Sequence, residues 1–318
     1  MEILQKKEIL QLIEDEKQRL GSYRAVASKC KISEAAISQL RKGSYAADGD
    51  DIYRTIGLSL GYSFADADDT WRLAETSNYL MVTQVLEDAR NECLCIGISH
   101  KAGSGKTSAS SAYLNAHRRE GVFKINCMEW TAVPLLSEIA REIGAEVPRG
   151  YSSNISGMIT GIATAIKAMR VRGIRPLIIL DQANSLKQSA FRSLIHLDNK
   201  CEDLTGVVIL GTENLEYAIK RGVRLFHDGY DEFDSRFGRK YIHLSGAPLS
   251  DVRKICEVNG ITDREQQKRI FDECEHARIT LDDGRRIEVV EDIRRLKRIV
   301  KREKLNGRTA GQSKSYNS

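Results

Sequence analysis

The sequence predicts an α/β fold in which helices cover both faces of a parallel β-sheet. From about residue 71 onward, short unbroken runs of Val, Ile and Leu alternate with helical patterns, as is typical of buried parallel strands. The first 61 residues contain only helical patterns, and so does the chain after residue 248. We therefore expect a small all-α domain before the sheet and a helical lid after it.

The composition indicates a globular chain. Of its 318 residues, 41% are hydrophobic and 29% are charged, which excludes a mainly disordered protein. The formal charge of +5 permits a nucleic-acid partner without requiring one. No apolar run approaches the ~18 residues that span a membrane, and the N-terminus is unlike a signal peptide. The seven cysteines include no C-x2-C pair, so we expect reduced thiols in a cytoplasmic protein.

The N-terminal domain is expected to span residues 1–61. Apolar positions on one face and capping residues predict its helices, at residues 3–20, 22–30 and 33–43. Ser33 is a good N-cap for the third of them. The polar, acidic residues 62–70 are the predicted linker.

The sheet domain is expected to span residues 71–246, the lid residues 247–305, and a disordered tail residues 306–318. Short, mainly apolar runs predict five strands, at residues 94–99, 122–126, 176–181, 207–211 and 241–244. Helical patterns lie between the first four strands, at residues 106–118, 132–143, 154–172 and up to residue 196.

The strongest chemical signal is the sequence HKAGSGKT at residues 100–107, between a predicted strand and a predicted helix. Its glycines allow backbone N–H groups to turn toward a phosphate, its Lys can reach the β- and γ-phosphates, and its hydroxyl can reach Mg²⁺. The expected nucleotide-binding residues are His100, Lys101, Ala102, Gly103, Ser104, Gly105, Lys106, Thr107 and Ser108. His100 stands where the pattern usually has glycine. The alternative is a tight turn without a ligand.

A second acidic strand end follows in the sequence PLIILDQAN. Asp181 can hold Mg²⁺ together with Thr107, or can be only an acid at a helix N-terminus. The next residue is ordinarily a glutamate that deprotonates the attacking water, but here it is Gln182. An amide cannot accept that proton at neutral pH, so we expect nucleotide binding with impaired hydrolysis.

Two further candidates follow the fourth strand. Thr212 can sense the γ-phosphate, or can simply cap a helix. Within residues 233–240 an arginine can reach the γ-phosphate of a neighbouring subunit. Arg236 is our first choice, because it has no obvious partner within its own subunit, and Arg239 is the second. A solvated basic turn is the alternative.

Residues 23–45 fit a helix–turn–helix. Ile32 can fill the turn, and Ile37 and Leu40 can face inward. The outward side chains of the second helix can then contact DNA, and the candidates are Ser38, Gln39, Arg41 and Lys42. A protein-docking three-helix domain is the alternative.

The order AGSGKT, LIILDQAN, GTEN and SRFGRK, followed by a helical lid, resembles AAA+ ATPases. The preceding helix–turn–helix and the sequence AET at residues 74–76 resemble, more narrowly, the transposition ATPases related to phage Mu B, TnsC and IstB. This resemblance covers about residues 1–305. It implies ATP and Mg²⁺ as cofactors and a homo-oligomer, as a ring or a helical filament, on double-stranded DNA. It also implies Arg294 as a sensor in the lid and Arg149 as a DNA contact, although a lone loop arginine is ordinarily just solvated.

The sequence therefore predicts a DNA-binding ATPase that acts largely independently of DNA sequence, and the resemblance adds recruitment or activation of a transposase at target DNA. The expected catalytic residues are Lys106, Asp181, Gln182, Thr212, Arg236 and Arg294. Two alternatives remain open. One is an ATPase that loads a replicative helicase, and the other is a nucleotide-gated transcriptional regulator whose helix–turn–helix reads an operator.

Overall fold

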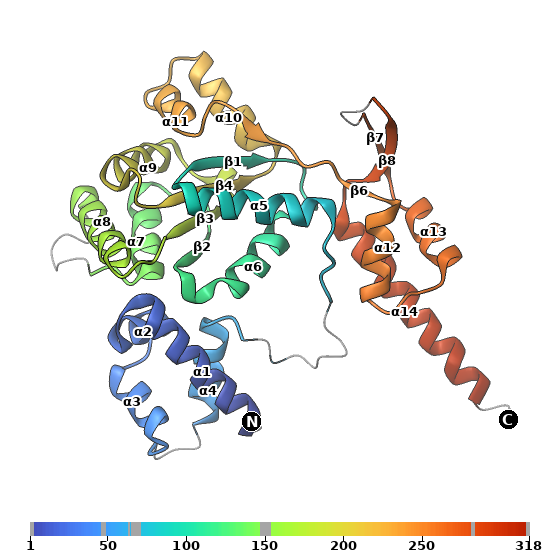
Figure 1. Cartoon of the computed structure of the whole chain (residues 1–318), viewed down its shortest axis with the longest axis horizontal. Coiled ribbons are helices and arrows are strands. Elements are labelled where there is room, and N and C mark those ends of the chain that lie inside the picture. Colours follow the sequence, from blue (N-terminus) through green and yellow to red (C-terminus); the bar gives the residue numbers. More distant parts are fainter. Residues whose placement is uncertain are drawn as a thin grey trace.

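The computed structural model describes residues 3–45, 49–62, 64, 71–146, 154–280 and 284–315, with only the backbone described from residue 307 onward. Within these residues the centre of the fold is a five-stranded parallel sheet in the order β2-β3-β4-β1-β5 (Figure 1). The strands are β1 (Cys95–Ser99), β2 (Val122–Asn126), β3 (Leu177–Asp181), β4 (Gly206–Gly211) and β5 (Tyr241–Ile242). The predicted α/β fold is confirmed, and β5 is shorter than predicted.

Helices cover both faces of the sheet because successive strand residues point to opposite sides. The covering helices are α5 (Ser77–Glu92), α6 (Lys106–Ala116), α7 (Ala132–Ile143), α8 (Ile155–Val171) and α9 (Gln188–Cys201). In β3, Ile178 and Leu180 belong to the apolar cluster formed with α7, α8 and α9. Leu177 and Ile179 belong to the cluster formed with α5 and α6. Burial on both faces explains why the strands contain unbroken apolar runs.

The strand register places the functional loops at one edge of the sheet. Ser99 of β1 lies beside Gly211 of β4, and Asn126 of β2 lies beside Asp181 of β3. Because all these strands are parallel, the loops that follow β1, β3 and β4 open at their common carboxyl edge, where ligands bind in open α/β sheets.

The N-terminal domain is a four-helix unit that contains the predicted helix–turn–helix. Its helices are α1 (Ile3–Leu20), α2 (Tyr23–Cys30), α3 (Glu34–Lys42) and α4 (Asp50–Ser59). The hydroxyl groups of Ser22 and Ser33 accept hydrogen bonds from backbone N–H groups and cap α2 and α3. The sequence analysis did not predict α4. Ile37 and Leu40 are buried as predicted.

A buried arginine joins this domain to the sheet. Arg19 at the end of α1 donates hydrogen bonds to the carbonyl of Val122, at 2.6 Å, and to the carboxylate of Glu16, also at 2.6 Å. Its guanidinium lies over the ring of Phe123, 4.5 Å from the centroid. Arg19 and Glu16 are 1% and 0% exposed. Their buried charges are therefore stabilised by each other and by the carbonyl of Val122 in β2, and not by water.

Further charges complete this junction. The ammonium of Lys29 lies 3.1 Å from Glu16 and 2.5 Å from Glu142 of α7. Burial alone would raise the pKa of Glu16, but the charges of Arg19, Lys29 and Arg118 outweigh it and lower the pKa. The N-terminal domain is thus held on the sheet by a paired set of buried charges.

The C-terminal segment contains a small sheet as well as helices. Its elements are β6 (Ala247–Pro248), α12 (Leu249–Val258), α13 (Arg264–Glu273), β7 (His276–Thr280), β8 (Arg286–Val290) and α14 (Ile293–Ser315). The strands form an antiparallel sheet in the order β6-β8-β7. The prediction of helices alone was therefore wrong for residues 276–290, where partly buried Ala277 and Ile279 alternate with exposed neighbours in a strand pattern.

Helix α14 continues to Ser315 (Figure 1), so the chain is helical where a disordered tail was predicted from residue 306. Most of the predicted linker, at residues 65–70, lies outside the described residues, and so do residues 316–318.

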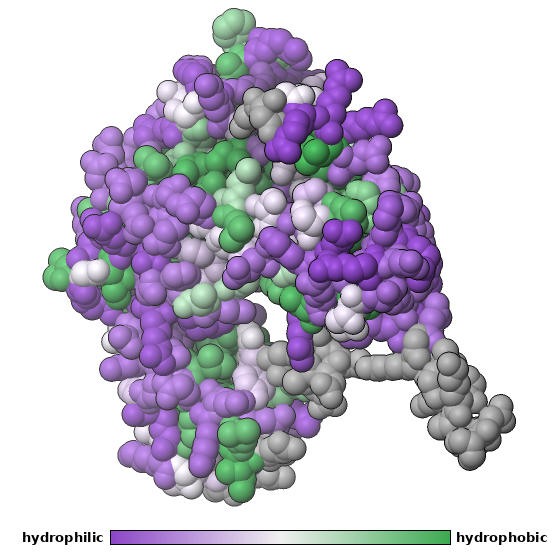
Figure 2. Space-filling view, turned by 45° about the vertical axis from the view of Figure 1, so that its right-hand side comes forward, coloured by the Kyte–Doolittle hydropathy of each residue, from purple (hydrophilic) through white to green (hydrophobic). Residues whose placement is uncertain are grey.

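Among the described residues, no helix has the length and apolarity needed to cross a membrane. The face shown in Figure 2 is mostly hydrophilic, with apolar side chains in small, scattered groups. The seven cysteines all lie in described parts of the chain, and none of them is in a disulfide.

We predict that Arg19→Ala lowers the free energy of unfolding by about 3 kcal/mol, because it removes one partner of a buried ion pair. Urea denaturation measures this loss. Arg119→Ala is the matched control, since Arg119 pairs with Asp15 at 2.5 Å while itself 54% exposed, and it should cost less than about 1 kcal/mol. Equal losses in the two variants would contradict the role given to Arg19.

Candidate functional site

The loop from β1 to α6 has the backbone that its glycines predict. Gly103 and Gly105 have φ angles of +84° and +94°, in the left-handed region that favours glycine. A Cβ atom on Gly103 would also lie 2.3 Å from Oδ1 of Asp292, at the start of the lid helix. Because α6 begins at Lys106, its first N–H groups point toward the loop and can bind an anion.

Lys106 is held at the mouth of this loop. Its ammonium donates hydrogen bonds to the carbonyls of His100 and Lys101, at 2.7 and 2.9 Å, and to the hydroxyl of Ser104 at 2.9 Å. Burial lowers the pKa of Lys106 to about 8, although the charges of Asp181 and Glu213 oppose this shift. The side chain is therefore still mainly positive at pH 7.

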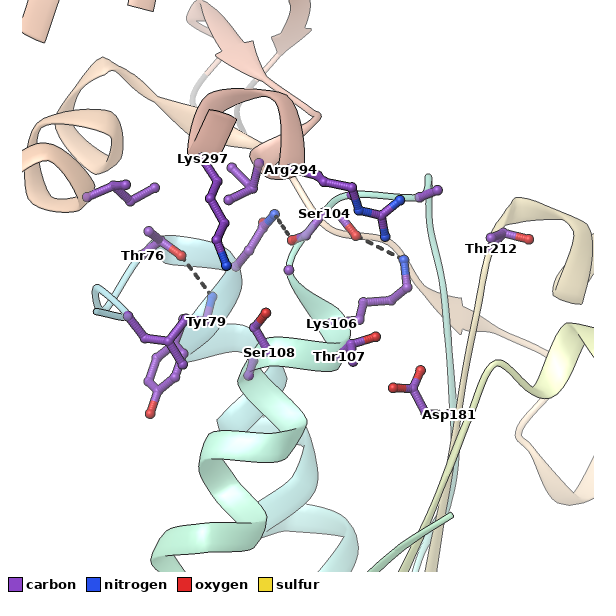
Figure 3. A pocket seen from close by; sticks show the side chains of 18 of the residues that line it. Thr76, Tyr79, Ser104, Lys106, Thr107, Ser108, Asp181, Thr212, Arg294 and Lys297 are labelled. Carbon is purple, nitrogen blue, oxygen red and sulfur yellow. Dashed lines mark hydrogen bonds between the residues drawn. The ribbon is translucent and has the colours of Figure 1, made fainter. Parts of the chain in front are cut away.

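A cavity of about 430 Å³ opens beside the loop (Figure 3), within the size range of small-molecule sites. Its wall brings together predicted residues from four separate segments: residues 102–108, Asp181 with Gln182, Thr212, and Arg294. Predicted site residues that are 190 positions apart in sequence thus share one cavity.

Two predicted loop residues do not line this cavity. Lys101 points away and pairs with Glu291 at 2.8 Å. His100 is 9% exposed, and its Nε2 is buried without a hydrogen-bond partner. Burial, followed by the charge of Lys106, lowers the pKa of His100, so its ring stays neutral near pH 7. The side chains of these two predicted residues therefore lie outside the cavity wall.

Asp181 is the carboxylate of the cavity wall. Its Oδ1 accepts a hydrogen bond from the backbone N–H of Gln182 at 2.9 Å. Its Oδ2 is buried and accepts no hydrogen bond, but it lies 3.0 Å from the ammonium of Lys124, so a cation there would share this oxygen. In Figure 3 the hydroxyl of Thr107 and the carboxylate of Asp181 lie on the same side of the loop. Mg²⁺ is ordinarily held by one or two such groups together with phosphates and water, so these residues fit the ion.

The described residues contain no cluster of three or more His, Cys, Asp or Glu side chains that could hold a metal ion by themselves. A metal at this site would therefore depend on the nucleotide's phosphates for its remaining ligands.

The tips of β3 and β4 are tied together by a residue that the sequence analysis missed. Asn184 accepts a hydrogen bond from the backbone N–H of Thr212 at 3.1 Å, and Ser99 donates its hydroxyl to the carbonyl of Thr212 at 2.9 Å. Gln182 is exposed and has a left-handed φ of +58°, which is uncommon outside glycine. Thr212 and Gln182 are thus held on the cavity wall by their backbones.

The lid closes another side of the cavity. The first turn of α14 contacts the loop directly, because the N–H of Ile293 donates to the carbonyl of Gly103 at 2.9 Å. Asp292 caps this helix by accepting from the N–H groups of Arg294 and Arg295, at 2.9 and 3.1 Å. Arg294 and Lys297 both line the cavity, as Figure 3 shows. The sequence analysis predicted Arg294 but not Lys297.

The segment before β1 supplies the remaining wall. Asn78 of α5 donates to the carbonyl of Ser104 at 3.2 Å and accepts from the N–H of Ser245 at 3.1 Å. It is 4% exposed, and no motif in the sequence marked it. Trp71 and Tyr79 add aromatic surface to the cavity wall. The cavity wall therefore combines polar groups of the loop with aromatic surface, as small-molecule sites do.

Arg236 does have partners within its own chain, so the opposite premise of the sequence analysis was wrong. At the end of α11 (Tyr230–Arg236) it pairs with Asp198 at 2.6 Å and Glu232 at 3.1 Å. Asp198 lies on α9, 38 residues away in sequence, whereas Glu232 lies one turn earlier on α11 and could have been recognised as a partner from its i,i+4 spacing. Arg239 is 51% exposed and pairs with Asp231 at 2.7 Å. Neither arginine lines the cavity of its own chain.

The DNA-contact candidates are only partly free. Gln39 and Lys42 are exposed on α3, and Ser38 is half-buried. Arg41 pairs with Glu14 at 2.6 Å and lies 4.0 Å from the centroid of the Tyr23 ring, so it would have to leave both to reach a phosphate. Arg149 lies outside the described residues.

Residues 89–219 match the sequence profile of a family described as "AAA domain". This match and the observed strand order agree with the P-loop AAA+ fold. No curated protein matches the sequence of this chain.

Among solved structures, the chain is similar to Cdc6p from Pyrobaculum aerophilum, with a TM-score of 0.45 and 18% identity over 62% of this chain and 52% of that one. It is similar to the Aeropyrum pernix ORC2 protein in its ADPNP–ADP complexes, with a TM-score of 0.42 and 12% identity over 61% and 55%. A third similarity is to Drosophila ORC bound to AT-rich DNA and Cdc6, with a TM-score of 0.35 and 9% identity over 81% and 100%.

The chain thus spans about half the length of the first two structures, and similarities this low carry no argument about its function. None of these comparisons concerns the Mu B, TnsC and IstB group, so that narrower resemblance stays a prediction.

Proposed function

We propose that this chain is an ATP-dependent, DNA-binding AAA+ ATPase. The observation that carries the proposal is the shared cavity, in which Lys106, Asp181, Thr212 and Arg294 converge from four segments. Lys106 and Arg294 supply positive charge for phosphates, and Asn78 together with the lid fixes the loop that would cradle them. Because these groups come from four separate segments, the fold as a whole brings them together, and no single motif does so.

Thr107 and Asp181 are the residues that would hold Mg²⁺ in this site. When bound, the ion would offset negative charge on the phosphate oxygens during transfer to water. Lys106 would bind the same phosphates directly, and the α6 N-terminus would orient them through its backbone N–H groups. Binding therefore draws on groups that the chain already holds in place.

We expect hydrolysis of the bound ATP to be slow. Gln182 lies on the cavity wall, where its amide can orient a water molecule but cannot take its proton. We therefore propose that the chain binds ATP well and turns it over slowly, so that its ATP-bound form persists.

We predict that Gln182→Glu raises the ATP turnover rate at least about tenfold, because a positioned general base typically contributes 10²–10⁴-fold. Glu has nearly the same shape as Gln and would adopt the same left-handed backbone at this position, so the substitution changes only the amide to a carboxylate. Phosphate release under steady-state conditions measures the change. Equal turnover by the two proteins would show that another residue supplies the base.

The N-terminal domain is the proposed DNA-binding unit. Exposed Gln39 and Lys42 belong to the second helix of the helix–turn–helix, the element that enters the major groove in this motif. Because Arg19 and Lys29 fix this domain to the sheet, DNA contact and nucleotide binding would occur on one rigid body. Binding through phosphates would be largely independent of sequence and would weaken steeply with salt.

Assembly would bring Arg236 to a neighbouring subunit. Arg236 does not line the cavity of its own chain, and we propose that it acts at the site of another copy once it leaves Asp198. We propose that ATP-bound subunits form a ring or filament on double-stranded DNA and, following the resemblance to Mu B, TnsC and IstB, recruit or activate a transposase there.

The test is electron microscopy of the protein with duplex DNA and a non-hydrolysable ATP analogue. We expect ordered assemblies that form only when both are present, and Arg236→Ala should abolish them while retaining nucleotide binding. Arg269→Ala is the control, because Arg269 is 68% exposed and makes only a 4.0 Å ion pair. If Arg236→Ala assembles normally, Arg236 is not the arginine that acts at the neighbouring subunit. A footprint at one defined palindrome, without assembly, would favour the transcriptional regulator instead.

A further inference from the structure

A second lysine lies behind the phosphate site, and the sequence analysis did not single it out. Lys124 is on β2 and its side chain is 6% exposed. Its ammonium donates hydrogen bonds to the hydroxyl of Ser111 at 2.8 Å and to the carbonyl of Thr107 at 3.3 Å. The same nitrogen lies 3.0 Å from Oδ2 of Asp181. Lys124 is therefore fixed between the first turns of α6 and the end of β3.

In this position Lys124 competes with a metal ion for the negative charge of Asp181. The ammonium lies 3.0 Å from Oδ2, the oxygen that accepts no hydrogen bond and that a metal ion would have to share. Two positive groups near one carboxylate repel each other, most strongly where side chains are shielded from water. Among the described residues that line the cavity, Asp181 is the only carboxylate, so no other acid on the wall compensates.

We propose that Lys124 is a positioning residue that partly neutralises Asp181, a proposal that rests on the proposed ATP site. Lys124 thereby reduces the contribution of Mg²⁺ to ATP binding. Lys106 and Arg294 also line the cavity and can offer positive charge to phosphates without a metal. The chain would thus bind ATP with appreciable affinity even without the metal. A lysine that only braced β2 against α6 would change affinity equally with and without Mg²⁺.

The experiment compares the Kd of a non-hydrolysable ATP analogue in saturating Mg²⁺ with its Kd in excess EDTA, by calorimetry. In Lys124→Met the Kd in EDTA divided by the Kd in Mg²⁺ should rise about fivefold or more, the lower range of coupling between two ligands. Lys124→Arg keeps the charge and should retain the wild-type ratio. Lys187→Met is a second control, because Lys187 pairs with Glu129 at 2.9 Å on the surface, and it too should leave the ratio unchanged.

An unchanged ratio in folded Lys124→Met overturns the proposal. If that variant does not fold, Lys124→Gln replaces it, since the amide can still donate to Ser111 and Thr107. Failure of both variants to fold would assign Lys124 to the fold alone and would also overturn the proposal. If the wild-type chain binds no nucleotide in either condition, the proposed ATP site itself is wrong, and the two failures are thereby distinguished.

Discussion

The contact between the phosphate loop and the lid is the constraint on which the site depends. The carbonyl of Gly103 accepts the N–H of Ile293, and the space beside Gly103 is filled by the carboxylate of Asp292. That carboxylate also caps the helix that carries Arg294 and Lys297. A side chain at position 103 would push the lid away and would be strained by its φ of +84°. One glycine therefore fixes the distance between the loop and the lid cations.

Strand β2 links the two proposed functions of the chain. Its first residues, Val122 and Phe123, hold the guanidinium of Arg19 from the N-terminal domain, and the next residue, Lys124, lies against Asp181. Phe123, which contacts Arg19, and Lys124, which contacts Asp181, are adjacent residues of this extended strand. The proposed DNA-binding domain is thus anchored directly on the strand that supports the proposed magnesium carboxylate, and a shift of β2 would move both.

The sequence predicted the parts whose chemistry is local. Unbroken apolar runs gave the strands, glycine spacing gave the loop at residues 100–107, and the end of β3 gave Asp181. Residues that act through distant contacts carried no local signal: Asn78, Asn184 and Lys124 each bond to a segment far away in the chain. The same limit explains why Asp198, a partner of Arg236, was missed. The strands at residues 276–280 and 286–290 are a different failure, because their alternation was visible in the sequence.

The central claim is that nucleotide is bound jointly by the loop, the lid and the segment before β1. Hydrogen–deuterium exchange with and without a non-hydrolysable ATP analogue tests it directly. The account predicts that the analogue slows exchange together in residues 71–79, 102–108 and 293–297 of the wild-type protein, and in none of them in Lys106→Ala, which lacks the cation that faces the phosphates. Protection confined to the loop, or retained in Lys106→Ala, would contradict it.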